Sequence, residues 1–238
     1  MSSTVLQIGN TAADTVGLPR QATLVGNSNQ NAVKILRAIT AAGRDAHRDF
    51  EWAQLKREHT FATDASSSYA MPTYYDRMIL GTAWDRTQYR PLVGPLSSSK
   101  WQEYESGAIG VTGLSTLFRI YSNSDGDKVI EIYPSTDTGN TLAFEYIDSR
   151  RLISSSGDLQ EDIVADTDVF VIDDEVVEAG TVWRLLRMLG LNYDDEKLEY
   201  VKLIDERRAN DSGAPVLDLR LSGGSSFDPH VPSTGYGS

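Results

Sequence analysis

The stretch NQNAVKILRAITAAGRDAHRDFEW, residues 29–52, carries the strongest helical signal in the chain. Asn29 is a good N-cap residue. The face opposite the apolar side chains carries the basic residues Lys34, Arg37, Arg44 and Arg48. The pattern predicts an amphipathic helix over residues 31–52, with His47 on its exposed side. The apolar side chains that recur at steps of three and four residues are Val33, Leu36, Ile39, Ala42, Ala46 and Phe50.

A shorter helix is predicted before it, over residues 4–16, where the apolar spacing is looser. The run Gly17-Leu18-Pro19 is expected to end this helix, because glycine suits the position after a C-cap and proline cannot continue a helix. The first 20 residues lack both a basic start and an apolar core, so we expect no secretion signal.

The helical period returns late in the chain, over residues 173–190. Acidic residues open this segment, where they face the positive end of the helix dipole, and Gly190 closes it. A second helix is predicted over residues 194–209, and the three-residue link implies antiparallel packing. The apolar stripe of the first helix is Val176, Ala179, Trp183, Leu186 and Leu189; that of the second is Leu198, Val201 and either Ile204 or Leu203.

Residues 55–172 lack this period and are broken into short runs rich in β-branched and aromatic residues. The runs 118–121 and 129–133 flank Asp125-Gly126, which is the signal of a β-hairpin. In the next run, Leu142, Phe144 and Tyr146 alternate with Thr141, Ala143 and Glu145, so one face is expected to be buried. A last strand is expected between residues 168 and 173.

These patterns predict an α+β protein. An α-helical bundle built from both chain ends would carry an inserted β-rich domain, barrel-like or sandwich-like, and an extended C-terminal arm. The expected parts are residues 1–54 and 173–212 for the bundle, 55–172 for the inserted domain, and 213–238 for the arm.

Composition excludes several classes of protein. The chain has 238 residues, 40% of them hydrophobic, which is enough for a sizeable core, and no apolar run long enough to span a membrane. It has no cysteine, which excludes disulfides, thiolate nucleophiles and cysteine-bound metals. The net charge of −12 is the wrong sign for tight binding to nucleic acid.

The charge is unevenly distributed along the sequence. Residues 1–60 hold 7 basic and 5 acidic side chains, whereas residues 161–212 hold 6 basic and 15 acidic ones. We therefore expect the basic face of the early helix to gain modest electrostatic stabilisation from the acidic late helices within the bundle.

The histidines and the acidic hairpin loop do not form metal sites. His47, His59 and His230 show no paired metal spacing, and each is interpreted as structural or solvated. Residues 123–127 imitate the start of a calcium loop, but Lys128 occupies its sixth position and a proline its twelfth. We expect a solvated hairpin tip, with no metal and no cofactor.

Catalytic motifs are equally weak. The spacing Gly107-x-x-Gly110-x-x-Gly113 lacks the strand-to-helix setting of a phosphate-binding loop. Ser115 lacks a nucleophile elbow, and a carboxylate pair such as Asp166 and Asp168 is common in an acidic chain. The protein is therefore not expected to be an enzyme, and no catalytic residue is assigned.

A series of short motifs runs through the chain between about residues 5 and 213. The motifs are Gly17-Leu18-Pro19, Glu58-His59-Thr60-Phe61-Ala62-Thr63, Tyr69-Ala70-Met71-Pro72, Trp84-Asp85-Arg86, Arg90-Pro91-Leu92, Gly94-Pro95-Leu96-Ser97, Trp101-Gln102, Phe118-Arg119-Ile120, Leu142-Ala143-Phe144-Glu145-Tyr146-Ile147, Ala165-Asp166-Thr167-Asp168 and Trp183-Arg184. No single motif is specific. In this order they resemble the head-to-tail adaptor (connector) proteins of tailed bacteriophages, also called tail-tubular-A-like proteins. Lys100 and Val164 depart from the usual pattern.

The resemblance implies a structural virion protein with the bundle-and-insertion fold. It would form a ring, usually of 12 copies, that joins the portal protein to the tail nozzle or tail-tube protein and lets viral DNA pass. It would be found at the head-tail junction of the virion, and in the host cytoplasm during assembly, with no membrane partner. An acidic channel lined by the late helices would suit DNA passage.

The resemblance also implies roles for particular residues. The family-motif packing residues are Trp84, Arg90, Trp101, Phe144, Tyr146, Trp183 and Arg184. The arm would contact the portal or a neighbouring copy through Val216, Leu217, Leu219, Leu221 and Phe227. The β-rich domain would present the docking surface for the tail.

Two alternatives stay open at this point. A tail terminator or tail-tube subunit would share the location but not the helical bundle. A glycan-binding module would use exposed aromatic side chains of the β-rich part.

Overall fold

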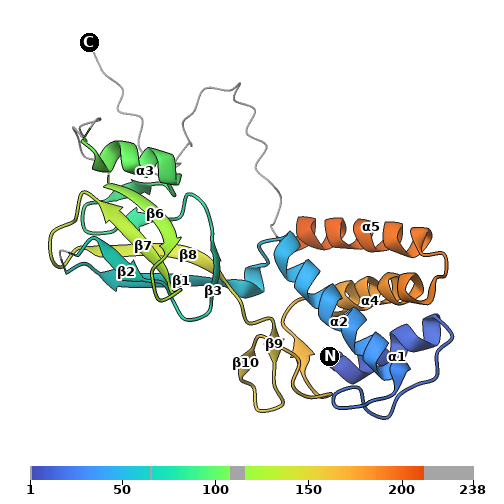
Figure 1. Ribbon diagram of the computed structural model, residues 1–238. Helices are drawn as coiled ribbons and strands as arrows, with labels where there is room; N and C mark the ends of the chain where they lie inside the picture. Colours follow the sequence, from blue (N-terminus) through green and yellow to red (C-terminus); the bar gives the residue numbers. More distant parts are fainter. Residues whose placement is uncertain (1, 65, 108–115, 212–238) are drawn as a thin grey trace, which may run out of the picture.

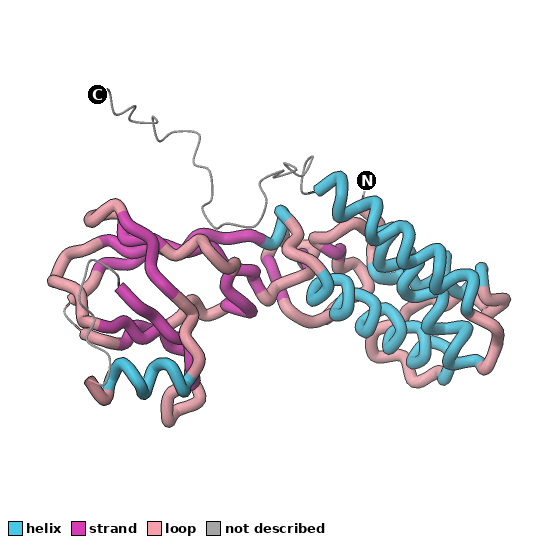
Figure 2. The backbone as a smooth tube through the Cα atoms, turned by 90° about the horizontal axis from the view of Figure 1, so that it is seen from above, coloured by secondary structure: helices cyan, strands magenta, loops and turns pink. Residues whose placement is uncertain are grey.

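The computed structural model describes residues 2–64, 66–107 and 116–211. They form an elongated α+β structure with most of the helices gathered at one end and a curled β-sheet at the other, which we call the helical lobe and the β lobe (Figures 1 and 2). The predicted α+β class is confirmed. The predicted contact residues Val216, Leu217, Leu219, Leu221 and Phe227 lie outside the described residues, as do Gly110, Gly113 and Ser115.

Local capping signals set the helix ends of the helical lobe. Thr4 forms a capping box with Gln7, because each side chain bonds the other residue's backbone N–H. Asn29 accepts a hydrogen bond from the N–H of Asn31, as the sequence predicts, and Gly190 ends its helix with a φ of 72°. The helices are α1 (Val5–Thr15), α2 (Gln30–Asp49), α4 (Asp174–Leu189) and α5 (Asp194–Asp211). In the described part of the chain, no helix has the length and hydrophobicity of a transmembrane span.

One hydrophobic core holds the helical lobe together. Helix α4 packs against α1, α2 and α5, and buried residues of all four helices belong to the same cluster. A second small sheet joins this core, with strands β9 (Leu152–Ile153), β10 (Leu159–Gln160) and β11 (Val169–Phe170) in the order β10-β9-β11. Although these strands fall within the range 55–172, they pack beside the helices rather than in the β lobe (Figure 1).

The buried face of α2 differs from the predicted one. Ile39, Ala42 and Ala46 are buried as expected, but Val33 and Leu36 are half-buried. Their places in the core are taken by Ala32, Ile35 and Ala38, whose small or slim side chains allow close approach of neighbouring elements.

The predicted exposure of His47 is wrong. Its side chain is 4% exposed, and Nε2 donates to the carbonyl oxygen of Asp148 at 2.9 Å. The cause is tertiary, because the end of the β lobe covers the last turn of α2 and supplies this acceptor.

The predicted apolar stripe of α5 is also wrong in part. Leu198 and Val201 are 54% and 42% exposed, whereas Tyr200 and Ile204 are 6% and 3% exposed. Tyr200 turns towards α4, where its ring lies 6.3 Å from that of Trp183. The larger aromatic contact thus decides which face of the helix is buried.

The expected electrostatic pairing within the helical lobe has the opposite polarity. Arg184 of α4 pairs with Asp45 of α2, and Arg208 of α5 lies 4.0 Å from Asp49 of α2. Acidic residues of α2 therefore meet basic residues of the late helices, while the basic face of α2 points elsewhere.

The β lobe is built on one large sheet with a single parallel pair in its order, β1-β8-β4-β5-β6-β7-β2. Strands β6 and β7 form the predicted antiparallel hairpin, and Leu142 and Phe144 are buried in the core as expected. The strands are β1 (Lys56–Ala62), β2 (Ser68–Ala70), β3 (Tyr75–Met78), β4 (Trp84–Asp85), β5 (Arg90–Val93), β6 (Thr116–Ser122), β7 (Lys128–Tyr133) and β8 (Thr141–Asp148). Strand β3 also pairs with β8, the short helix η1 (Ala53–Leu55) precedes β1, and helix α3 (Ser98–Glu105) follows β5.

Candidate functional site

The seven family-motif residues lie in three separate places. In the helical lobe, Trp183 and Arg184 lie together on α4 and are almost fully buried. The Arg184 guanidinium is 4.1 Å from the Trp183 ring, donates to the Gly180 carbonyl at 2.7 Å and pairs with Asp45. These contacts join α4 to α2, which is a packing role.

A second group lies around α3. Trp101 is 2% exposed, with the Arg119 guanidinium 4.7 Å from its ring and the Tyr133 ring 6.2 Å away at a steep angle. Arg119 also pairs with Glu131 on the neighbouring strand. Arg90, at the start of β5, is half-buried and lies opposite Asp85 of β4 in register. Trp101 therefore attaches α3 to the sheet.

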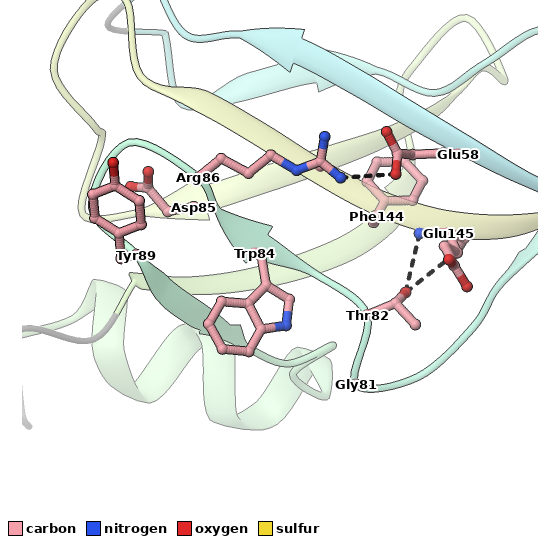
Figure 3. A pocket seen from close by; sticks show the side chains of 10 residues that line it. Glu58, Gly81, Thr82, Trp84, Asp85, Arg86, Tyr89, Phe144 and Glu145 are labelled. Carbon is pink, nitrogen blue, oxygen red and sulfur yellow. Dashed lines mark hydrogen bonds and ion pairs between the residues drawn. The ribbon is translucent and has the colours of Figure 1, made fainter. Parts of the chain in front are cut away.

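The third group lines a hollow of about 670 Å³ on the β lobe (Figure 3). Phe144 and Tyr146 belong to the core beneath it, whereas Trp84 is 44% exposed and Tyr89 is 87% exposed. The residues that line the hollow are Glu58, Gly81, Thr82, Trp84, Asp85, Arg86, Tyr89, Ala143, Phe144 and Glu145.

Strand pairing explains why Trp84 stays exposed. On β4, Trp84 faces outwards and Asp85 faces inwards. The residues opposite Trp84 are Ala143 on β8 and Pro91 on β5, and both are too small to cover an indole. A large apolar surface is thus left on one side of the hollow.

Two carboxylates face each other on the other side. Glu58 on β1 and Glu145 on β8 are directly opposite in register, an arrangement that is unfavourable for like charges. Arg86 reaches Glu58 at 2.7 Å, as Figure 3 shows, and this hydrogen bond lowers the pKa of Glu58 and raises the pKa of Arg86. Within the described residues Glu145 has no ion pair, so the hollow keeps a net negative charge.

Asp85 shapes the turn beside the hollow. Its Oδ1 accepts hydrogen bonds from the N–H groups of Thr87 at 3.0 Å and Gln88 at 2.9 Å. This turn presents Tyr89, which has a φ of 56° and projects into solvent. Asp85 is 0% exposed, and its Oδ2 accepts no hydrogen bond from the described residues.

The carboxylate pair of Asp166 and Asp168 has a structural use that the sequence analysis missed. Asp166 accepts hydrogen bonds from the N–H groups of Leu24 and Val25 through Oδ1, at 3.0 and 2.9 Å. Asp168 Oδ2 accepts from two backbone N–H groups of its own turn, both at 2.8 Å. These bonds account for the two aspartates in the motif of residues 165–168. Aspartate side chains in turns commonly accept hydrogen bonds from nearby backbone N–H groups, so their position in a turn could have predicted this role.

Other candidate chemical groups also have structural partners. His59 lies against Phe61 and Phe144, with ring centroids 5.6 and 5.4 Å away, and burial lowers its pKa. Asn123 Oδ1 accepts from the N–H groups of Asp125 and Asp127, so it organises the hairpin tip. In the part of the chain that the structure describes, no three potential metal ligands form a cluster.

A sequence model of the SU10 adaptor protein family matches residues 3–215. The chain belongs to the SU10 adaptor protein family. This is a family of phage head-to-tail adaptors, so the resemblance seen in the motifs is confirmed. No curated protein matches the chain.

Membership of the adaptor family supplies the broad function. The protein is a structural phage adaptor, and the family is not an enzyme family. Its place is in the virion at the head-tail junction, where an adaptor interacts with portal and tail proteins.

Proposed function

We propose that the protein forms the adaptor ring, usually of 12 copies in such adaptors, that joins the portal to the tail nozzle or tail tube and gives viral DNA a passage. The observation that carries this proposal is the family match over residues 3–215. The shape supports it, because two lobes with separate hydrophobic cores offer a different binding surface at each end of the molecule (Figure 2).

The connection between the lobes supports a fixed geometry. The Arg77 guanidinium of the β lobe donates to the carbonyl oxygens of His47 and Phe50 at the end of α2, at 3.1 and 2.8 Å. In the same place His47 bonds Asp148, and the Trp52 indole N–H donates to the carbonyl of Ala46 at 2.7 Å. An adaptor needs such bracing, since its two partners must stay in register.

The two lobes would have different partners. The helical lobe, with the arm of residues 213–238, would contact the portal and neighbouring copies, and Val216, Leu217, Leu219, Leu221 and Phe227 remain the proposed contact residues of the arm. The β lobe would dock the tail through the hollow at Trp84. Exposed tryptophan and tyrosine beside charged groups are the residue types that dominate binding energy at protein interfaces.

The charge of the protein suits DNA passage. At −12 per copy, a ring carries a large negative charge, so DNA phosphates are repelled by most of its surface rather than held. Passage in this proposal needs no catalytic residue, cofactor or metal, and a chelator is expected to leave assembly unchanged.

Imaging of intact particles tests the proposal directly. A label fused to this chain should appear as a ring between portal and tail in projection images. A label on the tail tube or tail tip instead of the neck would contradict the proposal. The same images would reveal a tail terminator by the height of its ring, which would differ from that of an adaptor ring. The family match favours an adaptor.

The hollow also supports a second candidate function, which is glycan binding. An exposed indole beside carboxylates and a threonine hydroxyl suits the apolar face and hydroxyl groups of a sugar. Quenching of tryptophan fluorescence by host surface polysaccharide, lost in Trp84→Ala, would support it. Unchanged fluorescence together with tail loss in Trp84→Ala particles would support tail docking.

A further inference from the structure

We propose that neighbouring copies in the ring bind each other through two helix faces of opposite charge, α2 of one copy against α5 of the next. The inference rests on the proposed ring and names its subunit contact. A closed ring needs a head-to-tail contact between two different faces of the same chain. The helical lobe carries two such faces.

The first face is the basic stripe of α2, formed by Lys34, Arg37, Ala41, Arg44 and Arg48. These residues are spaced by three and four, so they share one side of the helix, opposite its buried residues. Most of the stripe borders a shallow hollow of about 460 Å³ that also reaches Leu36, Thr40 and Asp45, and the Asp45 carboxylate is paired with Arg184. In the described residues, Arg44 is the one member with an ion pair, to Asp162 at 3.1 Å.

The second face is the acidic stripe of α5, formed by Asp194, Asp195, Leu198, Glu199, Val201 and Glu206, with the exposed Lys202 as a cation among the four acids. Leu198 and Val201 are 54% and 42% exposed, although both lie in the middle of a helix. The four acids have no ion pair within the described residues. The arginines of α5 turn inwards instead, Arg207 to Asp173 and Arg208 towards Asp49.

One copy cannot bring its own two stripes together. Helix α4 packs against both α2 and α5 through the apolar core, and the ion pairs of α2 with the late helices use its acidic residues, Asp45 and Asp49. The basic and acidic stripes therefore lie on different sides of the helical lobe. Apart from the pair of Arg44 with Asp162, the charges of the two stripes have no ion-pair partner among the described residues, and they complement each other between molecules.

The two faces also match in size and composition. Helices of 20 and 18 residues are about 30 and 27 Å long, so they can lie along each other for most of their length. Ala41 is the small residue in the middle of the basic stripe, where Leu198 and Val201 can pack between the arginines. Apolar contact then lies at the centre of the interface and opposite charges at its edge, which fixes partner and register.

Charge reversal tests the pairing. The first variant is Arg37→Glu/Arg48→Glu, and the second is Glu199→Lys/Glu206→Lys. None of these four residues makes an ion pair in the described part of the chain. Glu206 is near Arg207, whose ion pairs are with Asp173 and Glu175. Each variant alone sets two stripes of the same sign against each other. With Arg44 paired to Asp162, the altered α2 stripe carries −1 against −3 on α5, and the altered α5 stripe, which also holds Lys202, carries +1 against +3 on α2. Copies assembled with the portal protein should then yield at least tenfold fewer tailed, DNA-filled particles than the wild type.

An equimolar mixture of the two variants should restore assembly. The reversed α2 of one variant meets the reversed α5 of the other, and the unaltered faces meet as before, so alternating copies close an even-numbered ring. The matched control is Lys56→Glu/Arg187→Glu, which changes the net charge as much as the first variant but lies off both stripes, and it should assemble like the wild type. Thermal melting of each variant confirms that the fold is kept.

Four results separate the inference from the proposed function. Normal rings from both variants, or folded variants whose mixture fails to assemble, overturn the α2–α5 contact alone. Normal rings with altered DNA retention in Glu199→Lys/Glu206→Lys also overturn it, since α5 would then line the channel. Wild-type particles that lack a ring of this chain at the neck refute the adaptor ring itself.

Discussion

Replacing Asp168 by alanine should lower the free energy of unfolding by about 3 kcal/mol. Asp168 is 1% exposed, and its Oδ2 accepts hydrogen bonds from the N–H groups of Val164 and Ala165, both at 2.8 Å. Hydrogen bonds to a charged group contribute about 1.5–3 kcal/mol each. Val164 is 68% exposed, so water can bind its N–H when the Asp168 carboxylate is removed. The expected loss for the two hydrogen bonds together is therefore at the lower end of their summed range.

The loss should spread beyond this turn because the turn holds the start of α1. The carbonyl oxygen of Asp168 accepts from the N–H of Val5 at 2.8 Å, and Val169 forms an isolated bridge with Thr4. Loosening the turn also moves Asp166, which binds the loop at Leu24. Native-state hydrogen exchange should therefore show faster exchange at α1 as well as at residues 164–168.

Urea denaturation followed by circular dichroism measures the effect, with two further variants for comparison. Asp168→Asn keeps an acceptor oxygen without the charge and should lose about 1–2 kcal/mol. Asp162→Ala removes the ion pair to the exposed Arg44 and the ion pair to Arg151, whose side chain is 12% exposed, and should lower stability by about 1 kcal/mol. A loss in Asp168→Ala no larger than that in Asp162→Ala would refute the reasoning.

Three further predictions concern core packing, pH and the arm. Gly43→Ala should destabilise by about 1–3 kcal/mol, because the new Cβ overlaps the Phe170 ring, and Phe170→Leu in the same chain should recover part of the loss in urea titrations. Burial lowers the pKa of His59, so stability should be complete above its unfolded pKa of 6.5 and fall as the pH drops below it; His59→Gln should flatten this dependence in melts between pH 7 and pH 5. Truncation before Ala214 should leave thermal melting unchanged but reduce the count of tailed, DNA-filled particles, and equal counts would show that the arm is dispensable.

The helices were predictable from sequence because their signals are local. Each signal acts on a helix end that lies within one turn of it in the sequence. These signals are the cap at Asn29, the glycines that end helices at Gly17 and Gly190, and the acids at the start of α4. The hairpin of β6 and β7 was predictable for the same reason, since its turn residues lie next to its strands.

Features that depend on distant partners were not predictable. The predicted apolar stripe of α5 was Leu198, Val201 and either Ile204 or Leu203. Ile204 is buried, but Tyr200, in contact with Trp183, is buried in place of Leu198 and Val201. The exposure of His47 was wrong because its partner, Asp148, lies 101 residues further along the chain.

The hollow at Trp84 was only half predictable. The sequence singles out Trp84 as a family-motif residue, but its exposure depends on which residues lie opposite it, and Ala143 comes from a strand far along the chain. The cross-strand register that places Glu58 against Glu145 is likewise a property of the assembled sheet.

Two paired strands, β1 and β8, connect the helical lobe to the sheet of the β lobe. The chain enters the β lobe through β1 and returns through β8, and these strands are paired from Lys56 with Ile147 to Ala62 with Thr141. A mechanical load between the lobes is thus shared by two covalent crossings lying side by side. The hydrogen bonds of Arg77 and His47 lie beside these strands and also cross between the lobes. A force on one end of the molecule is therefore transmitted to the other end through several connections rather than through one hinge.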